Sequence, residues 1–349
     1  MTEMTAHWAE DHPVLEVLRE RRERQSRPGR RDDGHFVALA VEGGGLRGVV
    51  SAAMLCALED IEVKNGFDII YSCSSGAINA AYFVGGETWY PTSIYFDDLT
   101  SKDFLDFRRI LRGQSIMNLD FALGDIVGER KPLSYEAVLK SEIPVHIMVT
   151  DIDNLTTRAP ADFSSAADLL SALRASMWLP LAVRGASPFR DFRGIDGGVL
   201  TAHPFLIAEK DERVTHILSL STRPMGSTRP GVSLLNRYVG FRLDRLRAGL
   251  GRGYVDAVRT YKQARRRIED ERLHPARRPY ILDLAPLPRH AEVIRHESNP
   301  WLLLEGARSG YEVVYSAVER KYRRAMLRLT VPDHNRAEFL FPVDRLNRH

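Results

Sequence analysis

The sequence has little cysteine and no long apolar run, and both absences narrow what the protein can be. Cys56 and Cys73 are the only cysteines in 349 residues, and both lie inside apolar segments. This argues against a disulfide scaffold and a cysteine-based metal centre, so we expect no metal and no cofactor. No window reaches the ~18–20 apolar residues that a membrane-spanning helix needs. The charged N-terminus lacks the apolar core of a signal peptide, so we expect a soluble, cytoplasmic protein.

The chain also has little net charge, but its charge is unevenly distributed. The formal net charge is only +3, which says little about partners. Residues 231–280, in contrast, hold thirteen Lys or Arg against five Asp or Glu. Apolar residues interleave with these charges. The segment is either a long solvated helix that packs on a sheet through an apolar stripe, or a basic amphipathic segment that contacts an anionic membrane surface. It matches no nucleic-acid-binding motif, so we expect no nucleic-acid partner.

Apolar runs alternate with helix-like segments along most of the chain. The pattern predicts strands at 35–42, 67–73, 143–150, 214–221 and 280–284, and helices at 49–60, 77–84 and 165–177. This alternation indicates an α/β fold with a parallel sheet covered on both faces. Clusters of Phe, Leu and Ile in residues 88–142 suggest helices that cover a pocket.

The same pattern gives the domain organisation. Residues 1–34 are predicted to be a charged arm and linker, with a short helix over 13–25. Residues 35–335 form one domain that includes the basic segment 231–280, and 336–349 form a C-terminal tail. A domain break at 225–232 is conceivable, but the late strand at 280 argues that the chain returns to the same sheet.

Two strand–turn–helix units follow one another near the start of the domain. The first apolar run ends in Gly43-Gly44-Gly45, and the second breaks at Ser74-Ser75-Gly76. A glycine-rich turn can direct backbone N–H groups at a developing oxyanion, because no Cβ obstructs their approach. A serine on a sharp strand-to-helix turn is held exposed near the positive end of a helix. Together these turns predict a nucleophile and an oxyanion hole for acyl transfer to water.

Three motifs in this order resemble the patatin-like phospholipases. They are Glu42-Gly43-Gly44-Gly45-Leu46-Arg47-Gly48, Cys73-Ser74-Ser75-Gly76-Ala77-Ile78-Asn79-Ala80 and Asp196-Gly197-Gly198. Residues 175–180 (ASMWLP) are similar to the A-S-x-x-x-P segment of that family. The resemblance covers roughly residues 36–210. It implies a three-layer α/β/α fold with a mostly parallel central sheet.

The resemblance also implies roles for individual residues. Ser74 is expected to be the nucleophile, and Asp196 the base that takes its proton without help from a histidine. The other expected site residues are Gly43, Gly44, Gly45, Arg47 and Gly48 for the oxyanion hole, Ser72, Cys73, Ser75 and Gly76 for the turn around the nucleophile, and Gly197 and Gly198 for the aspartate loop. The implied activity is metal-independent hydrolysis of fatty acyl esters of phospholipids or related lipids, with transient contact at the membrane surface.

Several alternatives remain open from the residues. Ser72 replaces the first glycine of G-x-S-x-G, which leaves room for a catalytically silent lipid-binding or scaffold protein on the same fold. His203 follows Asp196 and could complete a Ser-His-Asp esterase of the α/β-hydrolase type. Residues 43–48 also match G-x-G-x-x-G, a weak signal for a nucleotide-binding module. Arg47 could either hold the glycine loop or meet a substrate phosphate.

One further acidic motif is interpreted as structural. Asp151 and Asp153 imitate part of a calcium loop, but the required glycine and distal glutamate spacing is missing. Cys73, beside the proposed nucleophile, is interpreted as a packed strand residue.

Overall fold

The protein is described here from a computed structural model, which covers residues 7–227, 232–321, 328–330 and 338–340. Most of the predicted tail 336–349, and part of the possible break at 225–232, lie outside these residues.

The helices are α1 (Pro13–Glu23), α2 (Val49–Asp60), α3 (Ser75–Gly85), α4 (Trp89–Thr92), α5 (Tyr135–Leu139), α6 (Ala166–Ser176), α7 (Phe205–Ala208), α8 (Leu234–Leu243), α9 (Leu250–Glu271) and α10 (Pro300–Glu319). The shorter or irregular helical segments are η1 (Gly45–Gly48), η2 (Lys64–Gly66), η3 (Ile94–Asp98), η4 (Phe107–Arg112), η5 (Phe121–Arg130) and η6 (Gly197–Val199). The strands are β1 (Val37–Val41), β2 (Ile69–Cys73), β3 (Val145–Asp151), β4 (Thr156–Arg158), β5 (Ser187–Phe189), β6 (Phe192–Asp196), β7 (His216–Leu220), β8 (Tyr280–Leu284), β9 (Arg328–Thr330) and β10 (Glu338–Leu340).

The larger of the two sheets in the described residues is mostly parallel and organises the chain, and β9 and β10 form a separate antiparallel pair. The strand order of the larger sheet is β5-β6-β3-β2-β1-β7-β8, and β4 pairs with β3. The pairs β1–β2, β2–β3, β1–β7 and β7–β8 are parallel, whereas β4, β5 and β6 extend the β3 edge in antiparallel fashion. Because β1 and β2 are adjacent and parallel, their carboxyl ends meet at one edge of the sheet, where α/β folds bind ligands.

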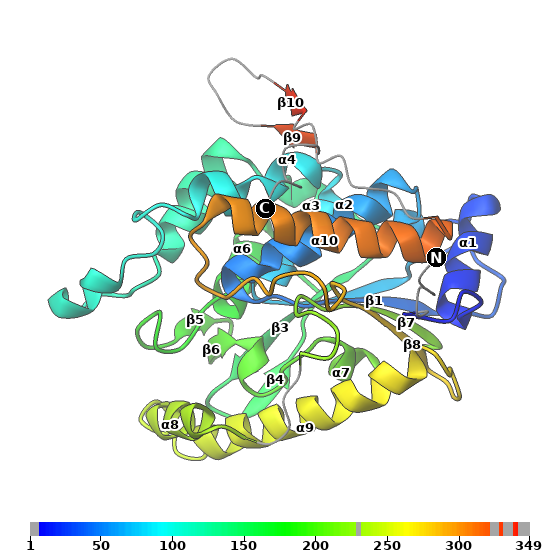
Figure 1. The fold of residues 1–349 in the computed structure, drawn as a ribbon. Coiled ribbons are helices and arrows are strands. Elements are labelled where there is room, and N and C mark those ends of the chain that lie inside the picture. The colour runs from blue at the N-terminus through cyan, green and yellow to red at the C-terminus, as the bar shows by residue number, and fades with distance from the viewer. Residues whose placement is uncertain (1–6, 228–231, 322–327, 331–337, 341–349) are drawn as a thin grey trace.

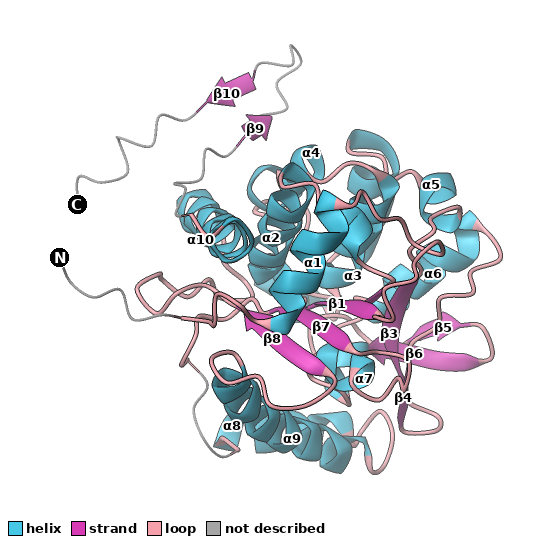
Figure 2. Ribbon diagram, turned by 90° about the vertical axis from the view of Figure 1, so that its right-hand side faces the viewer, coloured by secondary structure: helices cyan, strands magenta, loops and turns pink. Residues whose placement is uncertain are grey.

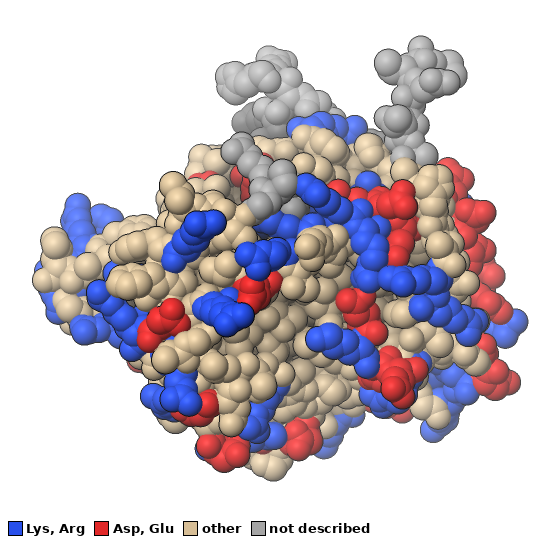
Figure 3. Space-filling model, turned by 90° about the horizontal axis from the view of Figure 1, so that it is seen from below, with Lys and Arg blue, Asp and Glu red and all other residues tan. Residues whose placement is uncertain are grey.

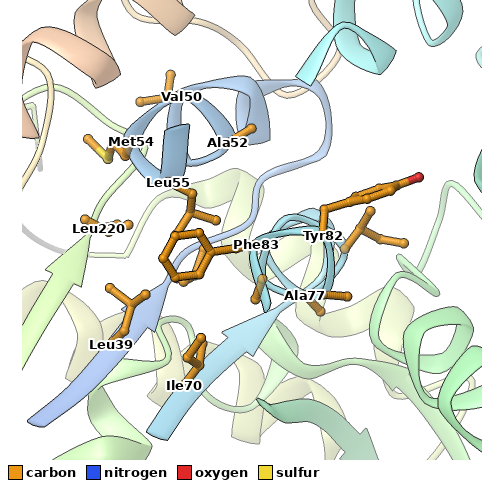
Figure 4. Close-up of a cluster of buried hydrophobic side chains, with 14 of the residues drawn as sticks. Leu39, Val50, Ala52, Met54, Leu55, Ile70, Ala77, Tyr82, Phe83 and Leu220 are labelled. Atoms are coloured by element: carbon orange, nitrogen blue, oxygen red, sulfur yellow. The ribbon is translucent and has the colours of Figure 1, made fainter. Parts of the chain in front are cut away.

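Helices cover both faces of this sheet, giving three layers (Figure 1; Figure 2). Alternate residues of β1 face opposite layers: Val37, Leu39 and Val41 join the larger apolar core, and Ala38 and Ala40 join the smaller one. The larger core packs beneath α1, α2, α3 and α10, and the smaller core against α7 and α9. Figure 4 shows Leu55 of α2 and Phe83 of α3 above Leu39 and Ile70 of the sheet. The expected three-layer α/β/α fold is confirmed.

The elements predicted from the sequence occur where expected, with ends that differ by a few residues. The helix predicted at 49–60 has the same bounds in the structure, and the strand predicted at 280–284 pairs in parallel with β7. The chain therefore returns to the same sheet after the basic segment. That segment forms two helices, α8 and α9, and only α9 packs beneath the sheet, through Tyr261 and Ile268.

The expectation that the charged N-terminal segment is a solvated arm is wrong for α1. Val14, Leu15 and Leu18 are fully buried in the larger core. The Arg21 guanidinium is buried as well and binds the carboxylates of Asp33 and Asp68. The apolar spacing of a short helix was visible in the sequence, but its burial depends on contacts with distant residues. The domain boundaries at 34 and 335 stay predictions.

We expect Leu18→Ala to destabilise the protein by about 2–5 kcal/mol, because it leaves a cavity in the core beneath α1. Glu20→Ala, on the exposed side of the same helix, is the matched control and should change stability by about 0.5 kcal/mol or less. Denaturant unfolding of the three proteins measures the difference. Equal stabilities of the Leu18→Ala and Glu20→Ala variants would show that α1 is a dispensable arm.

Candidate active site

Ser74 lies on the sharp turn between β2 and α3. Its backbone dihedrals are φ 56° and ψ −133°, a region that a non-glycine residue adopts only under strain of about 1–3 kcal/mol. This is the geometry in which a strand-to-helix turn exposes its central side chain. Ser72, the departure from the glycine pattern, belongs to β2, and its buried hydroxyl donates to the carbonyl of His146 at 3.1 Å. The Ser72 side chain is therefore held by a hydrogen bond to the neighbouring strand β3.

The glycine loop after β1 packs directly on this turn. A Cβ on Gly43 would lie 2.4 Å from the carbonyl oxygen of Cys73, and a Cβ on Gly76 would lie 2.6 Å from that of Val41. Both distances are below any real contact of a Cβ atom, so glycine is required at both positions for the two turns to meet. The Gly44 N–H donates to the Ser75 hydroxyl at 3.0 Å and joins the loop to the start of α3.

The expected oxyanion-hole residues separate into two groups. Gly43, Gly44 and Gly45 line the same pocket as Ser74, whereas Arg47 and Gly48 do not. The N–H groups of Gly43 and Gly45 donate to no acceptor in the part of the chain that the structure describes, while that of Gly44 is used by Ser75. Gly43 and Gly45 are therefore the loop residues whose N–H groups are free to bind an added oxyanion.

Arg47 supports the glycine loop from behind. Its Nε donates to the Thr222 hydroxyl at 2.9 Å, and its guanidinium lies against Gly44. Burial lowers the pKa of Arg47 to about 10, so the side chain remains a cation at neutral pH. Thr222 also binds the buried carboxylate of Glu42, with its backbone N–H at 2.6 Å and its hydroxyl at 2.7 Å. Of the two roles left open for Arg47, this geometry supports the one that holds the loop.

Asp196 stands at the end of β6, beside Ser74. Its Oδ1 accepts the Gly198 N–H at 2.8 Å and lies 3.5 Å from the Cys73 thiol. Burial raises the pKa of Asp196 above that of an ordinary aspartate, and a hydrogen bond from the Ser74 side chain is the largest of the opposing effects. Burial likewise raises the pKa of the Cys73 thiol, which fits its interpretation as a packed strand residue. The structure therefore brings Ser74 and Asp196 together across 122 positions of sequence, since Cys73 pairs with Met148 of β3 and Asp196 pairs with the next residue of that strand, Val149.

His203 is committed to a different, buried network. Its Nδ1 accepts the Phe205 N–H at 3.2 Å, which leaves the proton on Nε2, 3.2 Å from the Ser221 hydroxyl. Ser221 in turn donates to Asp283, which is paired with Arg265. Burial lowers the pKa of His203, so the ring is held neutral. Among the described residues no histidine lines the pocket that contains Ser74.

The pocket has a volume of about 420 Å³, and most of its wall is apolar. One side is formed by residues from the segment that the sequence predicted to cover a pocket, namely Ile94, Leu99, Phe104, Met117, Ala122, Leu123 and Val127. Ile78 and Tyr82 of α3 complete this wall below Ser74. A site of this kind fits a long apolar chain whose reacting group lies at Ser74.

The pocket lining also includes three cationic side chains, those of Arg223, Lys262 and Arg295. The acidic lining residues are Glu42, already bound by Thr222, and Asp196. The Arg223 Nε lies 3.7 Å from the Glu292 carboxylate, whereas the buried Tyr261 hydroxyl has no hydrogen-bond partner among the described residues. Buried polar groups normally have partners, so the Tyr261 hydroxyl indicates where a polar group of a ligand would bind.

Sequence reasoning missed one residue that fixes the serine turn. The Ser176 hydroxyl accepts the Ser74 N–H at 2.8 Å and donates to the Met148 carbonyl at 2.7 Å. It thereby ties the Ser74 turn to β3 from the end of α6. Its only signal in the sequence is its place in the A-S-x-x-x-P segment.

Asp151, the residue that imitates part of a calcium loop in the sequence, accepts the N–H groups of Asp153 and Asn154, as a turn residue does. No cluster that could hold a metal ion occurs in the described ranges, and no helix within them is long and apolar enough to cross a membrane.

Several known proteins are similar to this chain. The family model of the patatin-like phospholipases matches residues 39–209. The uncharacterized protein YjjU of Escherichia coli (strain K12) is 27% identical over 185 residues, 52% of this chain, and the match spans about half (49%) of that relative. The crystal structure of VipD from Legionella pneumophila is similar with a TM-score of 0.45 and 12% identity, over 82% of this chain and 67% of that one.

We expect Ser176→Ala to lower turnover of a fatty acyl ester at least about tenfold with little change in KM. The substitution leaves the buried Ser74 N–H unpaired, at a cost of about 1–3 kcal/mol, and loosens the turn that aims the hydroxyl. Ser187→Ala removes another buried serine hydroxyl, on β5, and should leave turnover unchanged. A Ser176→Ala variant with wild-type kcat would show that the turn holds without this hydrogen bond.

Proposed function

We propose that this chain, which belongs to the patatin-like phospholipase family through residues 39–209, is a metal-independent serine hydrolase of fatty acyl esters of phospholipids or related lipids. The observation that carries the proposal is that Ser74, Asp196 and the glycine loop line one pocket, whose other lining residues are mostly apolar and include three cationic side chains. A lipid ester has matching parts: an apolar chain, a carbonyl and a polar headgroup.

In the proposed mechanism Asp196 is the base. As the Ser74 oxygen attacks the ester carbonyl, the carboxylate accepts the serine proton. The raised pKa of Asp196 favours this step, since a base works best when its pKa approaches the working pH. The N–H groups of Gly43 and Gly45 then donate to the oxyanion. Asp196 returns the proton to the leaving alcohol and afterwards activates the water that releases the fatty acid.

The alternatives find less support in the geometry. A Ser-His-Asp esterase requires a histidine within reach of the serine, and both ring nitrogens of His203 are engaged elsewhere. A silent scaffold was suggested by Ser72, whose hydroxyl is accommodated between β2 and β3 without blocking the turn. A nucleotide-binding module needs an open glycine loop, whereas this loop packs on the serine turn.

We expect Ser74→Ala and Asp196→Asn to lose essentially all ester hydrolysis, with EDTA present throughout, while His203→Ala keeps it if folded. The rate of the wild type should fall as pH drops through the pKa of Asp196, because protonation removes the base. Burial raises that pKa above 3.8, so the acidic limb should lie at higher pH than for an exposed aspartate. Rates on p-nitrophenyl acyl esters across pH measure this. Inactivity of the wild type on every ester would reject the proposal, and an inactive, folded His203→Ala variant would reject the dyad.

Stability of Asp196→Asn provides a second readout of the same prediction. Because the folded-state pKa is raised, the ionised carboxylate costs folding free energy above that pKa. Asparagine removes the charge and can still accept the Gly198 N–H. The variant should therefore be as stable as the wild type or more stable at neutral pH, and loss of activity cannot be attributed to unfolding.

The cationic pocket wall favours a phosphate-bearing lipid as substrate. We expect Arg223→Gln and Arg295→Gln together to lower kcat/KM for a phospholipid about tenfold or more, since each removes a charge-assisted hydrogen bond worth roughly 1.5–3 kcal/mol. Hydrolysis of a diacylglycerol with the same acyl chains, which lacks the phosphate, should change little. Arg252→Gln, a 91% exposed arginine that does not line the pocket, is the matched control. An equal loss on both lipids would mean that the two arginines act on the fold or on Asp196 instead.

A further inference from the structure

Two groups of large apolar side chains are exposed on the surface. The first lies on α8 and consists of Leu234, Leu235, Tyr238 and Phe241; the second lies on η4 and consists of Phe107, Ile110 and Leu111. Leu234 is 82% and Leu111 is 89% exposed, which is unusual for side chains of this size. On α8 the positions 234, 238 and 241 follow helical spacing, so these residues form one stripe. Together the two groups are called the docking surface below.

Both groups border the pocket. The opposite face of α8 contributes Asn236, Val239 and Leu243 to the pocket wall. The Phe107 ring of η4 packs edge-on against His296, at 6.0 Å, next to Arg295 in the wall. In Figure 1 η4 is the cyan helix that projects at the far left, and α8 lies at the lower left of the molecule. Each group of the docking surface therefore adjoins residues that line the pocket.

Arginines accompany both apolar groups. Arg108 and Arg112 flank the apolar residues of η4, and Arg237 lies within the α8 stripe. All three are exposed, and none makes an ion pair with a described residue. Figure 3 shows basic side chains gathered at the same left end of the molecule, where η4 projects. Exposed apolar side chains interleaved with unpaired arginines match the surface of an anionic phospholipid bilayer: apolar groups insert at the acyl boundary and arginines meet the headgroup phosphates.

We infer that the docking surface binds anionic phospholipid bilayers and places the pocket opening on the membrane, with η4 and α8 inserting on either side of it. The binding of the bilayer does not depend on the proposed hydrolysis of lipid esters. Only the identity of the substrate that enters from the bilayer rests on that proposed function. Insertion of both η4 and α8 into a bilayer explains why large apolar side chains stay exposed on these two helices. It also separates the roles of the basic segment: α9 packs beneath the sheet, and α8 contacts lipid.

The experiment is co-sedimentation of the full chain with vesicles of phosphatidylcholine alone and of phosphatidylcholine with phosphatidylglycerol. The Ser74→Ala background keeps the lipid intact during the measurement. Binding should require the anionic lipid and weaken with added salt. Leu234→Ser with Leu235→Ser, and Ile110→Ser with Leu111→Ser, should each weaken binding at least about tenfold. Replacing Arg108, Arg112 and Arg237 by Gln should weaken it about fivefold per arginine.

The control is Leu273→Ser, which removes a partly exposed leucine just beyond the carboxyl end of α9. Figure 1 shows that end of α9 at the opposite side of the molecule from α8. It should bind vesicles as the parent does. Parent protein that stays in solution with both vesicle types, or apolar variants that bind like the parent, would overturn the inference. So would variants that change only the oligomeric state measured by light scattering, since the surface would then join copies of this chain.

Failure of this inference and failure of the proposed function give different results. In the wild-type background, turnover of a water-soluble short-chain ester does not depend on the bilayer, so the docking variants should retain it within about twofold. Turnover of vesicle phospholipid should fall in parallel with binding. If the short-chain ester is hydrolysed but vesicles are not bound, the inference fails alone. If vesicles are bound but no ester is hydrolysed, the proposed function fails alone.

Discussion

The contact between the glycine loop and the serine turn is the constraint on which the rest of the site depends. Backbone atoms of the two turns lie so close that a side chain at Gly43 or Gly76 would collide with a carbonyl oxygen. This contact exists only because β1 and β2 are adjacent and parallel, so that their carboxyl ends coincide. It places the glycine loop and Ser74 in the lining of one pocket. Arg47 and Thr222 then fix the loop from behind, and Ser176 fixes the turn.

Burial of Asp196 shows a conflict between stability and chemistry. A buried carboxylate is costly inside a protein in its ionised form, and burial raises the pKa of Asp196 for that reason. The strained backbone of Ser74 adds to it. Such features persist when the surrounding structure holds them, and here a core on both faces of the sheet does so. A local cost of this kind, concentrated where two strands end, is typical of functional sites.

The sequence predicted the parts of this structure that depend on local pattern. Apolar runs gave the central strands, because a strand buried on both faces needs a continuous apolar run. The family resemblance of three short, contiguous motifs indicated Ser74, Asp196 and the glycine loop, which the structure brings to one pocket. Ser176 was named only as part of a motif, because its role arises from a hydrogen bond to a residue 102 positions away. The burial of α1 was missed for the same reason: Arg21 looks solvated until Asp33 and Asp68 are placed beside it.

The basic segment 231–280 shows why composition alone could not distinguish a helix that packs on the sheet from a helix that binds lipid. Its excess of arginine and its apolar residues are shared by α8 and α9, yet the two helices have opposite environments. α9 spans the lower face of the sheet and buries Tyr261 and Ile268. α8 ends before the left-handed turn at Gly249 that begins α9, and it contributes Asn236, Val239 and Leu243 to the pocket wall, so only that face of α8 is covered. An apolar stripe on the uncovered face then remains exposed unless a second surface meets it. Under the proposed function an acyl chain enters the pocket that α8 lines, and the lipid bilayer that supplies that chain is the surface that fits the stripe best.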